Sequence, residues 1–403
     1  MRVLVITNLF PNAKEPLSAP FNKQQFVALA QLCDVNVLGV IPWFPGARVF
    51  SRFSQAGKLV VVPHTEIIDG LTVHHPRWLH IPKIGNAIAG LLFAASLFPS
   101  VWKLRKEVDV VLGSWAYPDG FASVLLGELL RVPVVVKVHG SDLNLVADMP
   151  GPRRNLRWAF PKVARLVAVS KPLGEKAVTL GVSKERVRVI YGGLDENLFH
   201  LRDRSEARAA LGLKKTGRLI VFVGELKEAK GVFDLLEAFV GISKNEQDLS
   251  LVLVGDGEDR AACEARVAES GGKVTLVGAR PLEEVALWMS AADTITLPSW
   301  NEGTPNVLLE ALACGRKVVA TRVGGIPDLI DSPKLGELVP AKDLRALGEA
   351  LVRVAREDYD PAEVTATRKT YSWAKSAKKL CDVLVEAVEM YKLESVGKQG
   401  KSG

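Results

Sequence analysis

Short apolar runs alternate with longer, helix-like segments along almost the whole chain. The runs are rich in Val, Ile and Leu at successive positions, which is typical of strands buried on both faces of a parallel sheet. The predicted strands cover residues 3–7, 35–40, 110–112, 134–138, 166–169 and 187–190, and then 219–223, 250–254, 274–277, 294–297 and 317–320. Two such series predict an α/β fold of two facing, Rossmann-like, doubly wound domains.

The break between the two series sets the expected domain organisation. We predict an N-terminal domain over residues 1–195, a second domain over 196–371, a long amphipathic helix over 372–393 and a polar tail over 394–403. Open parallel sheets bind ligands outside the carboxyl ends of their strands. We therefore expect a cleft between the domains, with the functional residues directly after strands.

Composition and length fit a soluble globular chain. The 403 residues are 48% apolar, and the four cysteines form no CxxC pair, so a reducing compartment is expected. The most apolar stretch, about 12 residues, is short of the ~20 that span a bilayer. Because the first predicted strand follows Met1 and Arg2 directly, with no leader pattern, we expect a cytoplasmic protein.

Charge is distributed unevenly. Residues 1–200 hold 23 Lys and Arg against 14 Asp and Glu, a net charge of +9, whereas the remainder carries −2. A basic half can meet phospholipid headgroups, a pyrophosphate-linked acceptor or nucleic acid, or it can simply be a solvated surface. Segment 79–107 reads either as an interfacial helix or as an ordinary helix packed on the first sheet. Basic and aromatic residues are not interleaved on any strand, so we expect no nucleic-acid partner.

The strongest chemical signal follows the strand that ends at residue 297. Glu302 lies in a loop, Pro305 suits the first turn of a helix, and Glu310 lies about one and a half turns into that helix. Free amides at the helix start, expected at Asn306, Val307 and Leu308, form an anion site suited to a diphosphate. Two carboxylates beside a phosphate site fit a nucleotide sugar. The alternative is a helix-capping Glu302 and a solvated Glu310.

This passage resembles the signature of the retaining glycosyltransferases of family 4, also called group 1, which have the GT-B fold. Lys230 after Gly224 matches the lysine that binds the donor pyrophosphate in that family, although Glu225 stands where arginine is common and Lys227 could compensate. His139, in a His-Gly-Ser-Asp run, resembles the family's H-G-x-D element. The terminal helix resembles the one that crosses back to the first domain.

The resemblance implies roles for further residues. Glu302, Lys230 and His139 would be catalytic. The donor-binding set would be Glu310, Asn306, Val307, Leu308, Gly303, Thr304, Gly224, Lys227 and Arg280. By their position after strands, Trp115, Tyr117, Asp119 and Asp142 could line the acceptor side, but Trp115 could equally be buried in the core.

The implied activity is retaining, metal-independent transfer of a sugar from a nucleoside-diphosphate sugar to a hydroxyl of a glycan or lipid-linked acceptor. A UDP-sugar is favoured and GDP-mannose is possible, with a role in cell-envelope or exopolysaccharide synthesis. No cofactor or metal is expected, since the donor site has no D-x-D element. Peripheral contact with the inner face of an anionic membrane is a further expectation.

Two other activities fit less well. A nucleotide-sugar epimerase or hydrolase could use the same two-domain plan. An NAD-dependent oxidoreductase needs G-x-G-x-x-G, but the nearest match, from Gly255 to Arg260, has arginine in place of the third glycine.

Overall fold

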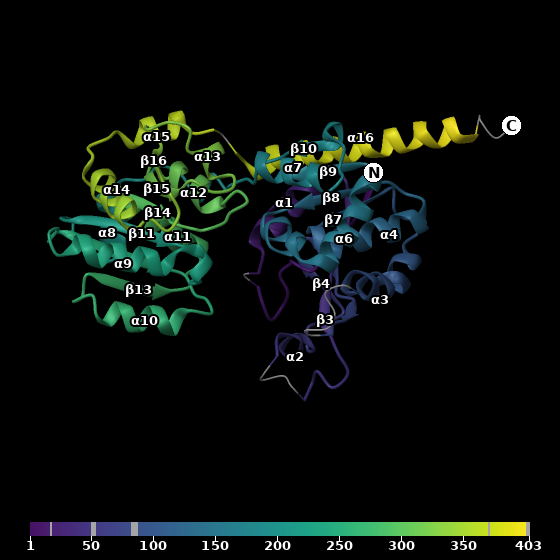
Figure 1. Ribbon diagram of the computed structural model, residues 1–403, viewed down its shortest axis with the longest axis horizontal. Coiled ribbons are helices and arrows are strands. Elements are labelled where there is room, and N and C mark those ends of the chain that lie inside the picture. Colours follow the sequence, from purple (N-terminus) through teal and green to yellow (C-terminus); the bar gives the residue numbers. More distant parts are fainter. Residues whose placement is uncertain (17, 50–53, 82–87, 370, 400–403) are drawn as a thin grey trace. The chain divides into compact units, whose positions relative to one another are not determined.

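The computed structural model describes residues 1–403 except 17, 50–53, 82–87, 370 and 400–403. The chain divides into two compact units (Figure 1). Unit 1 comprises Met1–Gly193 together with Trp373–Gly403, and unit 2 comprises Leu194–Ser372. The last helix of the chain therefore belongs to the unit that the first strand begins.

Unit 1 is built on an eight-stranded sheet of order β10-β9-β8-β7-β1-β2-β5-β4. Seven strands run parallel, and only β4 pairs antiparallel, with β5. The strands are β1 (Arg2–Thr7), β2 (Asp34–Gly39), β4 (Thr65–Ile68), β5 (Leu71–His74), β7 (Val110–Ser114), β8 (Val134–Val138), β9 (Arg165–Ala168) and β10 (Val187–Val189); β3 (Ile41–Trp43) and β6 (Arg77–Leu79) form a separate pair.

Alternate residues of the central strands enter two different cores, one on each face of the sheet. Val3 and Val5 pack with α1 (Pro20–Ala30) and α16 (Trp373–Gln399). Leu4 and Ile6 point the other way. That second face is covered by α3 (Ala89–Lys103), α4 (Phe121–Leu130), α6 (Pro150–Ala159) and α7 (Lys171–Thr179). Burial on both faces explains the uninterrupted apolar strands.

Helix α16 is longer than predicted. The predicted helix ended at residue 393, whereas α16 continues to Gln399, so most of the expected polar tail is helical and residues 400–403 lie outside the described part. The helix packs along α1, and Glu386 pairs with Arg165 of β9 and Arg188 of β10 at 2.7 and 2.8 Å. Core packing and these ion pairs together attach the end of the chain to unit 1.

Unit 2 contains an all-parallel, six-stranded sheet of order β13-β12-β11-β14-β15-β16. The order reverses between β11 and β14, whose carboxyl ends lie side by side. Ligands bind at such a switch point. The strands are β11 (Arg218–Val223), β12 (Leu249–Val254), β13 (Val274–Gly278), β14 (Thr294–Leu297), β15 (Lys317–Thr321) and β16 (Gly336–Val339).

The helices of unit 2 follow its strands in alternation. Helix α9 packs against α14, and α8 packs against α11. The helices are α8 (Arg204–Ala210), α9 (Val232–Ser243), α10 (Arg260–Ala268), α11 (Leu282–Ala291), α12 (Asn306–Ala313), α13 (Ile326–Leu329), α14 (Leu344–Arg356) and α15 (Pro361–Thr367); unit 1 adds the short α2 (Gln55–Leu59) and α5 (Ser141–Asn144).

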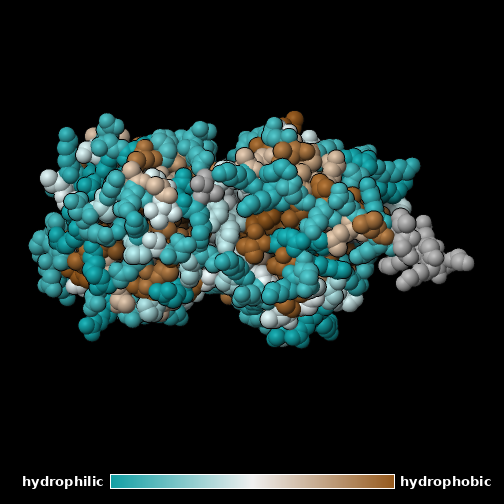
Figure 2. All heavy atoms as spheres, turned by 90° about the horizontal axis from the view of Figure 1, so that it is seen from above, coloured by the Kyte–Doolittle hydropathy of each residue, from teal (hydrophilic) through white to brown (hydrophobic). Residues whose placement is uncertain are grey.

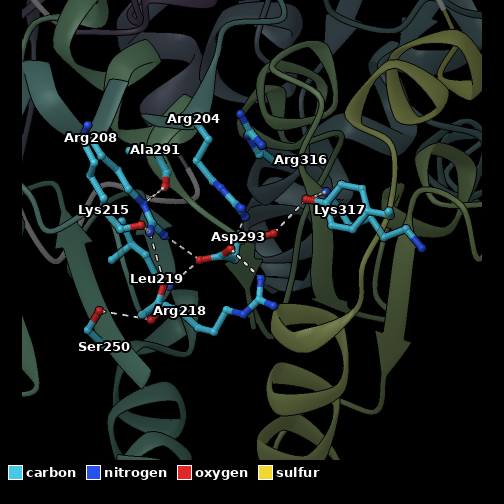
Figure 3. Close-up of polar contacts among 12 residues, drawn as sticks. Arg204, Arg208, Lys215, Arg218, Leu219, Ser250, Ala291, Asp293, Arg316 and Lys317 are labelled. Carbon is cyan, nitrogen blue, oxygen red and sulfur yellow. Dashed lines mark hydrogen bonds and ion pairs between the residues drawn. The ribbon is translucent and has the colours of Figure 1, made fainter. Parts of the chain in front are cut away.

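A buried carboxylate fixes the amino end of the unit 2 sheet (Figure 3). Asp293, directly before β14, accepts hydrogen bonds from Arg204, from Arg208 at 2.7 Å and from Arg218 at 3.2 Å. It also accepts one from the amide of Leu219 at 2.7 Å. Asp293 therefore ties α8 to β11 and β14, at the end of the sheet opposite the switch-point loops.

Polar and charged residues cover most of the face drawn in Figure 2, and hydrophobic residues occur there in separate groups. Among the described residues, no helix is both long and apolar enough to cross a membrane.

Candidate active site

The structure brings Lys230 and Glu302 into contact at the switch point of unit 2. Lys230 ends a 3-10 turn in the loop after β11, and its Nζ lies 2.7 Å from Oε1 of Glu302, in the loop after β14. The Ser299 hydroxyl donates to the same oxygen at 2.8 Å. Glu302 is only 8% exposed, so this carboxylate is held in one orientation by two donors. Ser299 was not predicted, because a serine in a loop carries no signal of its own.

Two glycines allow the loops around this pair to touch through their backbones. At Gly231 a Cβ would lie 2.0 Å from the carbonyl oxygen of Pro298, and at Gly324 it would lie 1.8 Å from that of Glu302. Both glycines have positive φ, which other residues adopt only at a cost. The loops after β11, β14 and β15 therefore form one rigid support for Lys230 and Glu302.

The amides of α12 start beside Glu302, but one of the three predicted amides is already used. The Leu308 amide donates to the Pro305 carbonyl at 3.2 Å. In the part of the chain that the structure describes, no acceptor is found for the amides of Asn306 and Val307. The helix also has no side-chain cap, so Glu302 does not play the capping role. Two free amides remain available for an anion.

Glu310 lies on α12, and among the described contacts no hydrogen bond or ion pair joins it to Lys230 or Glu302. The Glu310 carboxylate has no hydrogen-bond donor among the described residues, and burial raises its pKa from 4.5 to about 7. Glu310 is thus a mixture of protonated and ionised forms near neutral pH. A perturbed carboxyl of this kind is a reasonable candidate for a ligand contact.

The other residues predicted to bind the sugar donor lie in the loops after β11, β13 and β14. Lys227 pairs with Glu258 and Arg280 with Glu284, each at 2.9 Å, so neither cation contacts Glu302. Gly224 follows β11, and its carbonyl oxygen lies 1.8 Å from the Cβ that a side chain at Gly255 would have. Gly303 accepts from the Gly325 amide at 2.7 Å, and Thr304 is half-buried beside it.

In unit 1, His139 follows β8 and lies between two aromatic rings. The ring centroids of Phe21 and Trp115 lie 5.1 and 5.8 Å from its own. Burial, together with the charge of Lys137, holds the pKa of His139 well below its ordinary value, so the ring is neutral. Trp115 is only half-buried, and its φ of 127° marks a strained backbone of the kind found at functional sites.

The remaining acceptor-side predictions do not fit the structure. Asp142 is fully buried and accepts from the amides of Ala116, His139, Gly140 and Leu143, so it joins the loops after β7 and β8. Tyr117 and Asp119 are also buried: the Tyr117 hydroxyl accepts from the Gly90 amide, and Asp119 accepts from the Asn8 amide. These buried side chains hold the loops in place through hydrogen bonds to backbone amides, and they are not exposed to an acceptor.

Unit 1 instead contains a cavity of about 420 Å³ at the carboxyl ends of β1 and β2, which the sequence did not indicate. Phe10, Phe44 and Trp78 give it aromatic walls. At its base His75 is 1% exposed, with Nδ1 2.7 Å from the Gly39 carbonyl and Nε2 2.8 Å from Glu66. Its lining comes from segments far apart in the sequence, so no local motif could reveal it.

Comparison with known proteins identifies the family of the chain. Residues 60–198 match the model described as Glycosyltransferase Family 4, and residues 217–357 match that described as Glycosyl transferases group 1. A Bacillus subtilis (strain 168) protein, named provisionally as the teichuronic acid biosynthesis glycosyltransferase TuaC, is 30% identical over 90% of this chain and 92% of its own length. The chain belongs to glycosyltransferase family 4.

Other relatives of this glycosyltransferase widen the comparison. A D-inositol 3-phosphate glycosyltransferase of Catenulispora acidiphila is 28% identical over 84% of this chain and 86% of that protein. HepE of Anabaena in complex with UDP superposes with a TM-score of 0.66 at 19% identity, covering 98% of this chain and 100% of HepE. Starch synthase IV of Arabidopsis thaliana, bound to ADP and acarbose, gives 0.71 at 15% identity, covering 96% and 99%.

The fold is therefore GT-B, and the enzyme is a glycosyltransferase of the hexosyltransferase class. Lys230, Glu302 and Glu310 of this glycosyltransferase lie in the group 1 match, and His139 lies in the family 4 match.

Proposed function

We propose that the enzyme moves a hexose from a nucleoside-diphosphate sugar, preferably a UDP-sugar, to a hydroxyl of a glycan or lipid-linked acceptor with retention of configuration. The observation that carries this proposal is the contact between Lys230 and Glu302 beside the free amides of Asn306 and Val307. A cation and two amides suit a diphosphate, and a fixed carboxylate suits sugar hydroxyls.

The proposed chemistry depends on stabilising the leaving nucleoside diphosphate. As the sugar–phosphate bond breaks, negative charge grows on the diphosphate, and Lys230 with the amides of α12 stabilises it without reorganising. Groups fixed in advance in this way can take the role that a divalent cation has in other transferases. We propose that transfer proceeds without a metal and that EDTA leaves turnover unchanged.

Glu310 and His139 complete the proposed recognition. Ionised Glu310 would accept hydrogen bonds from the ribose hydroxyls, while neutral His139 would contact a hydroxyl of a substrate. Retention follows from attack by the acceptor hydroxyl on the face from which the diphosphate leaves, since no second carboxylate is assigned to the anomeric carbon.

The aromatic cavity of unit 1 is proposed to hold the acceptor. Phe10, Phe44 and Trp78 offer faces on which a sugar ring or an apolar chain packs. The names of two relatives, TuaC and the amylovoran biosynthesis glycosyltransferase AmsK of Erwinia amylovora, place those proteins in polysaccharide synthesis. We infer a role in polysaccharide or cell-envelope synthesis for this enzyme.

Peripheral membrane contact is the last part of the proposal. Leu91, Phe98 and Trp102 of α3 are 52%, 41% and 42% exposed, and the Arg105 guanidinium lies 4.8 Å above the Trp102 ring. Exposed aromatic and apolar side chains beside cations are typical of an interfacial helix.

A thermal-shift series with UDP-glucose, UDP-N-acetylglucosamine and GDP-mannose tests the donor. A donor at 100 times its Kd should stabilise unit 2 by about 2.7 kcal/mol. If no nucleotide sugar raises the melting temperature, the diphosphate assignment is wrong. Products from the best donor then separate the activities: an α-linked product from an α-linked donor supports retention, whereas free sugar alone would indicate a hydrolase.

A further inference from the structure

A chain of three side chains connects α1 to His139 inside unit 1. The amide nitrogen of Asn22 donates to the Leu9 carbonyl at 2.9 Å, which turns the Asn22 oxygen toward Ser114. The Ser114 hydroxyl donates to that oxygen at 3.2 Å. The Ser114 oxygen also lies 2.9 Å from Nε2 of His139. Asn22 and Ser114 are fully buried, so water does not compete for these bonds.

The directions of these bonds fix the proton on the imidazole. A serine hydroxyl has one hydrogen, and here Asn22 receives it. The Ser114 oxygen must therefore accept from His139, so Nε2 carries the ring hydrogen. In a neutral ring Nδ1 then holds a lone pair. Among the described residues, no donor is found for Nδ1, and His139 keeps part of its surface exposed.

We propose that Asn22 and Ser114 are positioning residues that hold His139 in its Nε2-protonated form, so that Nδ1 accepts a hydrogen bond from a substrate hydroxyl. The second half of this statement rests on the proposed function, and the first half does not. A lone pair at Nδ1 accepts from a hydroxyl and repels a phosphate or carboxylate oxygen, which carries no hydrogen. His139 therefore selects for a sugar hydroxyl at this point.

The other groups around the ring are compatible with this form. Lys137, two residues earlier on β8, is buried and donates to Gln25 of α1. Burial lowers the pKa of Lys137 to about 7, and its charged form disfavours a second proton on His139. Asp142 uses its carboxylate on backbone amides, including that of His139, and not on the ring. Phe21 and Trp115 contribute only their rings. Among the residues that the structure describes, Ser114 is thus the side chain that hydrogen-bonds to the His139 ring.

The test is a direct measurement of the tautomer by nitrogen NMR of protein labelled at the histidine rings. The His139 signals are assigned by their loss in His139→Gln. We expect the wild-type enzyme to show a protonated Nε2 and an unprotonated Nδ1 at pH 7.5. Ser114→Ala should give a mixture of both tautomers, as should Asn22→Ala, which keeps the serine but frees its hydroxyl hydrogen.

Ser123→Ala is the matched control. Ser123 is also a fully buried serine of unit 1, on α4, but its hydroxyl has no hydrogen-bond partner in the described structure. We expect it to leave the tautomer and turnover unchanged. Ser114→Ala should lower kcat/KM about tenfold, the effect of losing one oriented hydrogen bond of ~1.4 kcal/mol.

Three outcomes decide the matter. A wild-type ring protonated at Nδ1, or a tautomer unaffected by both Ser114→Ala and Asn22→Ala, overturns the positioning role. A tautomer that changes as expected while kcat/KM stays constant supports positioning and overturns the substrate contact of His139. If the wild-type enzyme binds none of the tested nucleotide sugars, the proposed function is contradicted, while the tautomer measurement remains valid.

Discussion

At the scale of single residues, the decisive contact is the one between Lys230 and Glu302. In the absence of a ligand each neutralises the other, and Ser299 keeps the carboxylate in place. The same contact holds the Lys230 ammonium in place, so both groups are oriented before a donor binds. The proposed preorganisation therefore depends on the pair and not on either residue alone.

Removing the lysine should affect turnover far more than folding. Lys230→Ala is expected to lower kcat about 100-fold, because one preorganised charge at the leaving group is lost. Lys214→Ala, an exposed lysine of the same unit, is the control and should leave kcat unchanged. Steady-state kinetics with the donor found by thermal shift measures both. Near-normal turnover of Lys230→Ala would reject the role of this residue.

Glu310 predicts a pH dependence of donor affinity. Its folded pKa of about 7 lies above the 4.5 of an unfolded glutamate, so it ionises between pH 6 and 8. If the ionised form accepts from ribose, Kd for a UDP-sugar should fall about tenfold from pH 6 to pH 8. Isothermal titration at both values tests this, and Glu310→Gln should remove the pH dependence.

The raised pKa of Glu310 also affects the free energy of unfolding, which should decrease as pH rises, whereas donor affinity should increase. Because the raised pKa makes ionisation of Glu310 unfavourable in the folded state, its stabilising, protonated form is complete below pH 4.5 and lost as pH rises through 7. Glu310→Gln should therefore gain stability relative to wild type between pH 5 and pH 8. A constant difference in melting temperature would contradict the burial of this carboxyl.

Sequence reasoning reached some residues of the candidate site and missed others for physical reasons. Lys230 and Glu302 belong to local motifs whose position after a strand already implies the switch point. Ser299 contributes through its distance from Glu302, which the sequence does not encode locally. Asp142 was predicted to line the acceptor side. Four backbone amides bind its carboxylate, and they come together only when the loops after β7 and β8 have folded.

At the scale of elements, α16 is the component whose attachment can be tested. Glu386 lies between Arg165 and Arg188, and their hydrogen bonds and charges lower its pKa to about 2. Because Glu386 is 36% exposed, solvent screens much of this interaction. The ion pairs thus supplement the apolar face of α16 and fix its rotation.

Glu386→Gln should reduce the stability of unit 1 by about 1 kcal/mol at pH 7, allowing for screening. Since the folded pKa is depressed, this contribution is present above the unfolded value of 4.5 and lost as pH falls toward 2. Denaturant melts at pH 7 and pH 3 measure the difference. Glu389→Gln, exposed on the same helix, should have no effect at either pH.

The elements were predictable wherever burial on both faces produced a continuous apolar run. The central strands of both sheets were expected at nearly their observed bounds. Strands β4 and β5 at the edge of unit 1, and β16 at the edge of unit 2, are only partly buried, so polar residues interrupt their apolar positions. Their exposure removed the signal, and the antiparallel pair was missed with them.

At the scale of the whole molecule, charge and exposed apolar surface occur together in unit 1. The first 200 residues, of which 1–193 belong to unit 1, carry a net charge of +9, and α3 exposes Phe98 and Trp102. Long-range attraction to an anionic surface and short-range insertion of aromatic rings would act in sequence. The first depends on salt, and the second does not.

Sedimentation with phosphatidylglycerol vesicles should show binding at 20 mM salt that weakens at 300 mM. Phe98→Ser with Trp102→Ser should lower the vesicle affinity about tenfold, through lost apolar burial. Val240→Ser, an equally exposed apolar residue of unit 2, is the control. Equal binding to neutral and anionic vesicles would contradict the electrostatic part, and no binding to either would reject membrane contact.

The position of α16 has a consequence for how the protein is made. Ala377, Leu380 and Leu384, from the very end of the chain, are fully buried in the core that Val3 and Val5 begin. During translation the nascent N-terminal sheet leaves the ribosome with only α1 on this face, and unit 2 emerges before α16 does. Unit 2 can complete its own core first. A chaperone that shields apolar surface would thus be needed most by the half synthesised earliest.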